Sequence, residues 1–220
     1  GGADHGWLDT RHTFSFARYY DPRFMGFRGL RVMNEDRVAA GGGFPLHPHR
    51  DMEIVTYPLA GALEHRDTLG NGGVIEPGQI QRMSAGTGIR HAEMNAAPET
   101  THFYQIWIEP RARGLRPGYE DVRLDGADPG FLRPVATPEG GARAVALQAD
   151  ARILAGRLVA GQRASHVVRP GRAAWLQVVR GKLRAGGQRL AAGDGAFTEE
   201  AGALRLDGAN DAEVLLFDLA

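Results

Sequence analysis

Two short stretches of the chain contain pairs of side chains that bind transition metals, with one residue between the members of each pair. The first pair is His47 and His49, and the second is His91 and Glu93. Residues two positions apart on a β-strand point to the same face. If the two strands lie side by side, facing Cβ atoms are about 4.5–5.5 Å apart. The four donors would then converge on a point that one cation can occupy.

The donor types indicate what chemistry such a site would support. Neutral imidazoles suit iron, zinc, copper and nickel, and sets of histidine and carboxylate with open positions suit non-haem Fe(II) oxygen chemistry. Three imidazoles and one carboxylate leave two places of an octahedron for water, substrate or dioxygen. One carboxylate on a divalent ion leaves a net positive charge, which favours an anionic ligand such as an enolate or a deprotonated ring hydroxyl.

Two neighbouring residues bear on this geometry. Glu53 shares strand parity with His47 and His49, so it competes with Glu93 for the carboxylate place; its other role would be a surface carboxylate or one that orients an imidazole. Pro48 cannot donate a hydrogen bond to a neighbouring strand, which indicates a strand edge or a bulge. A single strand histidine is more often structural, but two same-face pairs favour a metal site.

The elements that must position these residues are predicted to be strands. The 220 residues include 31 Gly and 12 Pro, helical periodicity is scarce, and short apolar or alternating runs are separated by turn residues. The stretch 109–141, rich in proline, is interpreted as a loose connection between two halves, part of which covers a barrel. The expected strands are 30–33, 53–57, 101–108, 154–159, 174–179 and 214–217.

The two halves contain a weak internal repeat of strand, glycine turn, strand and second glycine turn. In this repeat Gly61 corresponds to Gly181, and Gly78 corresponds to Gly193. The repeat predicts two similar barrels that arose by duplication.

At these residues the sequence resembles the cupins, and within them the pirin family. Gly41, His47, His49 and Glu53 have the spacing of the first cupin motif, although its final glycine falls one place late, and His91-x-x-x-Asn95 resembles the second. The resemblance to pirins covers most of residues 4 to 109 and is weaker from residue 110 onward. The segments similar to pirins are 4–8, 12–16, 34–36, 44–50 and 83–94.

This resemblance implies an all-β bicupin of two antiparallel β-barrels of the double-stranded β-helix or jelly-roll type. Residues 1–125 would form the metal-binding barrel, and residues 126–220 a barrel without metal ligands. It also favours Glu93 over Glu53 as the carboxylate ligand. The implied cofactor is one divalent transition metal, usually Fe(II), with the ligands His47, His49, His91 and Glu93.

The second half agrees with a barrel that lacks a metal. Counted from the paired glycines, the place of His91 is taken by Leu206, and an apolar side chain cannot bind a metal. His166 lies near the place of His47, but the partner place holds Arg169. We therefore interpret His166 as a polar strand residue.

The family includes proteins similar to flavonol dioxygenases, which open quercetin at its central ring and release carbon monoxide. We therefore expect an iron-dependent dioxygenase with a small aromatic, flavonol-like substrate, in which Glu93 is the catalytic base for the flavonol 3-hydroxyl. One alternative is a non-enzymatic metal protein whose oxidation state sets its affinity for a protein partner. Another is a different cupin enzyme, such as an isomerase.

Composition limits the partners. Lys plus Arg and Asp plus Glu both total 26, so the formal net charge is zero, and no direct nucleic-acid binding is predicted. The absence of cysteine excludes disulfide scaffolds and thiolate zinc sites. No apolar run approaches the ~20 residues that span a bilayer, and no signal peptide opens the sequence. We expect a cytoplasmic protein without a membrane partner.

Other polar and aromatic residues receive simpler interpretations. His65 and Asp67 alternate on an expected strand, and a solvated strand face is favoured over a position at the cavity mouth. Phe44, Met33 and Phe103 are candidate walls for a flat aromatic ligand.

Overall fold

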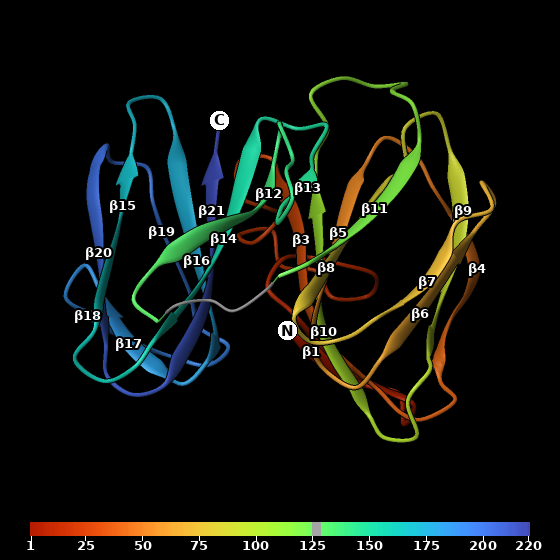
Figure 1. Cartoon of the computed structure of the whole chain (residues 1–220), viewed down its shortest axis with the longest axis horizontal. Coiled ribbons are helices and arrows are strands. Elements are labelled where there is room, and N and C mark those ends of the chain that lie inside the picture. The colour runs from red at the N-terminus through yellow and green to blue at the C-terminus, as the bar shows by residue number, and fades with distance from the viewer. Residues whose placement is uncertain (125–128) are drawn as a thin grey trace. The chain divides into compact units, whose positions relative to one another are not determined.

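The computed structural model describes residues 1–124 and 129–220, and these residues divide into two compact units (Figure 1). The first unit contains Gly1–Leu124 and Glu139–Ala149, and the second contains residues 129–138 and Asp150–Ala220. The expected domain boundary between residues 125 and 126 lies outside the described residues.

Every regular element of the described residues is a β-strand, so the all-β prediction is confirmed, and each expected strand is present (Figure 1). The strands of the first unit are β1 Gly2–Asp4, β2 Leu8–His12, β3 Leu30–Val38, β4 Gly43–His49, β5 Glu53–Ala60, β6 Leu63–Asp67, β7 Gly72–Ile75, β8 Gln79–Ser84, β9 Ile89–Asn95, β10 Thr101–Ile108, β11 Gly118–Arg123 and β13 Val145–Ala146. Those of the second unit are β12 Leu132–Thr137, β14 Ala151–Leu158, β15 Arg163–Val168, β16 Ala173–Arg180, β17 Lys182–Ala185, β18 Gln188–Ala191, β19 Gly195–Thr198, β20 Gly202–Gly208 and β21 Ala212–Leu219.

Two antiparallel sheets build the first unit. One has the order β1-β2-β3-β10-β5-β8-β11, and the other has the order β4-β9-β6-β7. Apolar side chains from both sheets meet in a shared core. Val38 and Phe103 of the larger sheet pack there with Leu63 and Ile75 of the smaller one. Burial of this core fixes which face of each strand points inward.

The second unit repeats this arrangement. Its strands follow the orders β12-β14-β21-β16-β19 and β15-β20-β17-β18. Leu176 and Leu216 of the first of these sheets share a buried core with Leu183 and Leu206 of the second. The pairs of sheets agree with the expected cupin architecture, and the closure of each pair into a continuous barrel stays a prediction.

The paired glycines of the internal repeat occupy equivalent turns. Gly61 and Gly181 have φ values of 73° and 71° between β5 and β6 and between β16 and β17. Gly78 and Gly193 have φ values of 87° and 89° before β8 and β19. All four residues are left-handed, a conformation that glycine adopts without a steric penalty. The sequence repeat is therefore a repeat of turn geometry.

Alanine at Gly78 and alanine at Gly193, the second glycine turns of the two halves, should lower the free energy of unfolding by the same amount. A Cβ atom added at Gly78 or Gly193 meets nothing within 4 Å, so only the left-handed backbone opposes the substitution, by about 1 kcal/mol. We expect Gly78→Ala and Gly193→Ala each to lower stability by that amount in urea-induced unfolding. A neutral result for either variant would show that its turn relaxes to another conformation.

The described residues of the proline-rich stretch 109–141 form more strand than the sequence indicated. It contains β11 and β12, and β11 pairs with β8 along its whole length. The interpretation of this stretch as a loose connection was therefore wrong for these residues. Pro134 in β12 coincides with a register shift between Pro134 and Ala136, as expected for a residue without an N–H group.

Candidate metal centre

The two pairs of potential ligands lie on adjacent strands, as their spacing predicted. Strands β4 and β9 are antiparallel neighbours, and His47 lies directly opposite His91. Strand β4 is at the edge of its sheet, and its register shifts between Phe44 and His47. The edge position and the nearby bulge explain why Pro48 is tolerated between two ligand-type residues.

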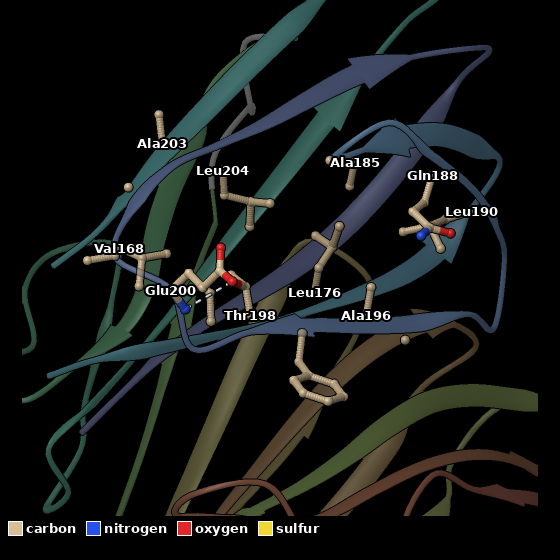
Figure 2. Close-up of a pocket in the computed structure, with 16 residues that line it drawn as sticks. Val168, Leu176, Ala185, Gln188, Leu190, Ala196, Thr198, Glu200, Ala203 and Leu204 are labelled. Atoms are coloured by element: carbon tan, nitrogen blue, oxygen red, sulfur yellow. Dashed lines mark hydrogen bonds between the residues drawn. The ribbon is translucent and has the colours of Figure 1, made fainter. Parts of the chain in front are cut away.

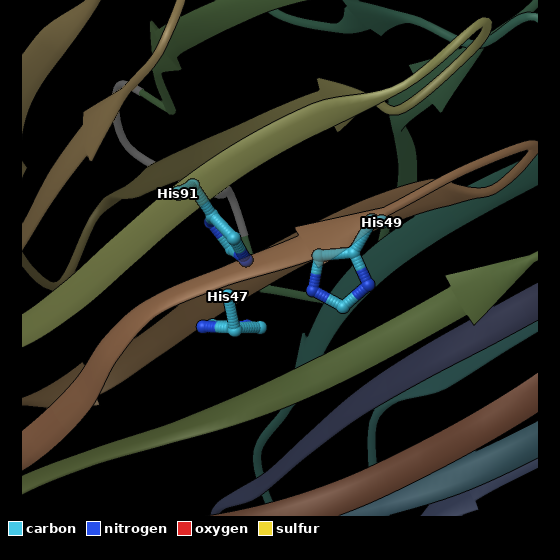
Figure 3. A group of neighbouring side chains, drawn as sticks. All are labelled: His47, His49 and His91. Carbon is cyan, nitrogen blue, oxygen red and sulfur yellow. The ribbon is translucent and has the colours of Figure 1, made fainter.

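Three imidazole rings gather at one place, as Figure 3 shows. The ring centroids of His47 and His91 are 4.5 Å apart, those of His47 and His49 are 4.8 Å apart, and those of His49 and His91 are 4.9 Å apart. One ring nitrogen from each lies within 4.8 Å of the others. Three nitrogens at such separations can share one metal ion with small side-chain movements.

The hydrogen bonds of these rings leave nitrogen lone pairs available. His47 Nδ1 lies 2.7 Å from the Pro45 carbonyl oxygen; because that oxygen only accepts, Nδ1 carries the proton and Nε2 is free to bind. The Nε2 atoms of His49 and His91 are buried and have no hydrogen-bond partner among the described residues. Buried polar atoms without partners are costly, so this arrangement fits a bound metal.

Burial also keeps two of the rings in the form that binds metals. It lowers the pKa of His49 to about 4 and that of His91 to about 2, and the neighbouring histidines add to both shifts. Both imidazoles are therefore neutral at neutral pH. Metals bind the neutral ring, so no proton has to be displaced from either one.

Glu93 lies beside these rings but belongs to a second group of potential ligands. Its Oε1 accepts from the Thr56 hydroxyl at 3.3 Å, and its Oε2 accepts from the Gln105 amide at 2.9 Å. One oxygen lies within 4.8 Å of ligand nitrogens of both His65 and His91. Burial raises the pKa of the Glu93 carboxyl. His91 thus connects Glu93 to the three-histidine group.

Glu53 serves a different purpose. It is buried, and its Oε2 accepts from the Ser84 hydroxyl at 2.9 Å and from the Gln148 backbone N–H at 3.0 Å. Within the described parts of the chain, neither group of potential metal ligands includes it. These bonds give Glu53 a structural role in holding the backbone at Gln148.

His65 and Asp67 are not on a solvated strand face, and that interpretation was wrong. Both side chains are 0% exposed, because β6 is an inner strand of its sheet and the Tyr119 ring stacks on His65 at a centroid distance of 4.7 Å. In the register of β6 and β9, His65 lies opposite Glu93 and Asp67 opposite His91. These two residues therefore adjoin the site.

A cavity of about 370 Å³ opens onto the histidines. Phe44 lines it as predicted, whereas Met33 and Phe103 are fully buried and are not among its lining residues. Most of its walls are aromatic or apolar. The lining consists of Trp7, Phe16, Phe44, Pro45, Ile54 and Trp107, the polar residues Asn34, Asp36 and Gln105, and the four residues His47, His49, His91 and Glu93.

Asp36 is a functional candidate that the sequence alone did not single out. Its side chain lines the cavity and is 4% exposed, and its Oδ1 accepts from the Thr10 hydroxyl at 2.5 Å. Burial raises its pKa to about 7, and the charge of Glu93 adds to this shift. The cavity therefore contains, besides Glu93, a carboxyl group whose pKa is raised toward neutral pH.

The second unit has a cavity of about 530 Å³ with a different character (Figure 2). Val168, Leu176, Leu190 and Leu204 are among the residues that line it. In the described residues of this unit no group of potential metal ligands occurs. Leu206, at the place of His91, is fully buried in the apolar core.

His166, near the place of His47, has a hydrogen-bond partner of its own. Its Nε2 lies 2.8 Å from Asp218 Oδ2. This contact agrees with the interpretation of His166 as a polar strand residue.

Known proteins resemble the chain over its whole length. Residues 2–108 match the family model described as Pirin, and residues 134–219 match the model described as Quercetinase C-terminal cupin domain. The chain is 44% identical over 220 residues to a quercetin 2,3-dioxygenase of Escherichia coli strain K12, covering 100% of the chain and 94% of that protein. The chain belongs to the pirin family.

Another relative of this pirin and a solved structure agree with the assignment. A pirin-like protein of Caulobacter vibrioides is 43% identical over 222 residues, covering 100% of the chain and 96% of that protein. The crystal structure of the bacterial pirin YhhW from Escherichia coli in complex with nickel(II) has a TM-score of 0.94 and 43% identity, covering 100% of the chain and 94% of that structure. The all-β, two-domain pirin fold of the cupin type is thus shown.

None of the described residues forms a helix long and apolar enough to cross a membrane.

Proposed function

We propose that this pirin is a metal-dependent dioxygenase that opens the central ring of a flavonol such as quercetin. The reaction consumes dioxygen, and one ring carbon leaves as carbon monoxide. The observation that carries the proposal is the group of three imidazoles, two with buried unpartnered nitrogens, in a cavity with aromatic walls. The Escherichia coli relative named quercetin 2,3-dioxygenase supports the same reaction.

The proposed cofactor is one divalent metal, with Fe(II) as the ion for this reaction. His47, His49 and His91 would bind it, and Glu93 would supply the fourth donor from the same cavity. The solved relative binds nickel(II), and imidazole nitrogens suit both metals. When bound, the metal supplies Lewis-acid chemistry and a template for the substrate oxygen and dioxygen.

The aromatic walls would position a planar substrate. The Trp107 ring meets the His49 ring edge-on at a centroid distance of 4.9 Å, and Phe16 meets Trp107 at 5.3 Å. These contacts hold Trp107 beside the metal site. Rigid aromatic surfaces of this kind orient a flat ring system and exclude water from it.

Glu93 is the proposed proton acceptor for the flavonol 3-hydroxyl. Burial raises the pKa of this carboxyl in the absence of a metal, so Glu93 would act as the base in the form that is not bound to the metal. Thr56 and Gln105 fix the position of both of its oxygens. The carboxylate can thus act at a set place in the cavity wall.

The proposal is tested by incubating quercetin in air with the protein loaded with iron or nickel. We expect loss of the flavonol absorbance together with carbon monoxide in equal amount. Protein treated with a chelator serves as the control and should be inactive. The absence of carbon monoxide with both metals would contradict the proposal.

A further inference from the structure

A row of buried side chains leads from His91 into the protein. His91 Nδ1 lies 3.4 Å from His65 Nδ1, and His65 Nε2 lies 3.2 Å from Asp67 Oδ2. His91 is 1% exposed, and the side chains of His65 and Asp67 are 0% exposed. Neither His65 nor Asp67 is among the proposed metal ligands.

Asp67 accepts hydrogen bonds at one end of the row. Its Oδ1 accepts from the backbone N–H groups of Leu69 at 2.8 Å and Asn71 at 3.0 Å, and its Oδ2 accepts from the Asn71 side-chain amide at 3.0 Å. With these donors around it, the Asp67 side chain is an ionised carboxylate that only accepts hydrogen bonds. The nitrogen of His65 that faces it must therefore be the donor, so Nε2 of His65 carries a proton.

The other nitrogen of His65 is then an acceptor, and a second contact agrees with this. Gln81 Nε2, which can only donate, lies 3.4 Å from His65 Nδ1, and Gln81 Oε1 lies 3.3 Å from the Tyr119 hydroxyl. In a neutral His65 the proton is on Nε2 and the lone pair is on Nδ1. His91 must then donate from Nδ1, which places its own lone pair on Nε2, the buried atom without a partner.

We propose that His65 and Asp67 are positioning residues, which hold the proton of His91 on Nδ1 and keep its Nε2 directed at the metal. The proposal rests on the proposed metal site and adds to it the residues that prepare one ligand. Hydrogen bonds to the distal nitrogen of a ligand histidine fix its ring and increase its basicity. Their removal typically lowers metal affinity 10- to 100-fold.

The competing role for His65 is that of a direct ligand. His65, His91 and Glu93 offer atoms that all lie within 4.8 Å of one another. A metal there would need the His65 Nδ1 lone pair, which in the structure faces the donors of Gln81 and His91. Loss of a direct ligand also has a larger effect than loss of a positioning residue, so affinity separates the two roles.

The experiment measures the affinity of the full chain for Ni(II) by competition with a chromophoric chelator. We expect His65→Phe and Asp67→Asn each to weaken binding by about 10- to 100-fold, with one ion still bound per chain. His65→Asn places an amide oxygen at the δ position, where His65 has Nδ1, so it can accept from His91 and should recover most of the affinity. A matched control, His102→Phe, breaks a histidine–carboxylate pair with Glu35 that lies outside the cavity lining and should leave the affinity unchanged.

The outcomes separate this inference from the proposed function. If the unaltered protein binds no Ni(II), the metal site itself is contradicted. If it binds Ni(II) and the His65 and Asp67 variants bind equally well, only the positioning role is overturned. A loss well beyond 100-fold, in the range for one direct ligand, or a changed Co(II) absorption spectrum in His65→Asn would also overturn it and make His65 a ligand. Asp67→Asn keeps the test valid if His65→Phe does not fold.

Discussion

Alanine at position 91 is expected to lower the affinity of this pirin for a divalent metal by about 10²- to 10³-fold. Four-ligand metal sites in small domains bind with roughly 10–16 kcal/mol near neutral pH, so one ligand contributes about a quarter of that free energy, which corresponds to a factor of this size. His91 is central because it belongs to both groups of potential ligands. The measurement is metal content after dialysis and Ni(II) affinity by chelator competition.

The matched control for His91→Ala is His166→Ala. His166 also lies on a strand and bonds to a carboxylate, that of Asp218, but it belongs to the second unit. We expect its removal to leave metal affinity unchanged. Retention of wild-type affinity in His91→Ala, with the fold intact by circular dichroism, would contradict the metal centre.

The strands and the three-histidine group follow from short-range patterns in the sequence. The alternation of a strand places His47 and His49 on one face, and the pairing of β4 with β9, which the prediction took as its condition, brings His91 opposite His47. Parity within a strand is a local property. The shared face of each ligand pair is predictable because it depends on only a few neighbouring residues, whereas the pairing of the two strands is a long-range contact.

The roles of His65 and Asp36 depend on long-range packing that the sequence does not display. The alternation of His65 with polar neighbours is the pattern of a solvated strand face. Its burial arises because β6 lies between β7 and β9 and because Tyr119 from β11 stacks on its ring. The strand β11 was itself hidden in a proline-rich stretch. The only sequence feature that pointed to a joint role for His65 and Asp67 was their position two residues apart, on the same face of a strand.

Replacing Asp36 by Asn is expected to stabilise the metal-free protein, and more so as the pH rises. Burial raises the folded-state pKa of Asp36 from 3.8 to about 7. Between these two pH values the carboxyl therefore holds a proton in the folded state and has lost it in the unfolded state. Stability supplied by this group is present below pH 3.8 and is lost as the pH rises toward 7. Asn has no proton to lose, so its advantage over Asp should be about 2 kcal/mol larger at pH 8 than at pH 5.5.

The comparison requires metal-free protein, because a cation in the same cavity would favour the ionised carboxylate and reduce the difference. The control is Asp211→Asn. The Asp211 carboxyl is exposed and its pKa is lowered by Arg157, so it is ionised in the folded and the unfolded protein at pH 5.5 and at pH 8. The effect of Asp211→Asn on the free energy of unfolding should therefore be the same at the two pH values. Equal effects of Asp36→Asn at the two pH values, measured by urea unfolding, would show that Asp36 is already charged at pH 5.5. The expected result would mean that the Asp36 carboxyl beside the histidines lowers the stability of the metal-free protein. Such a cost is typical of residues retained for function and not for stability.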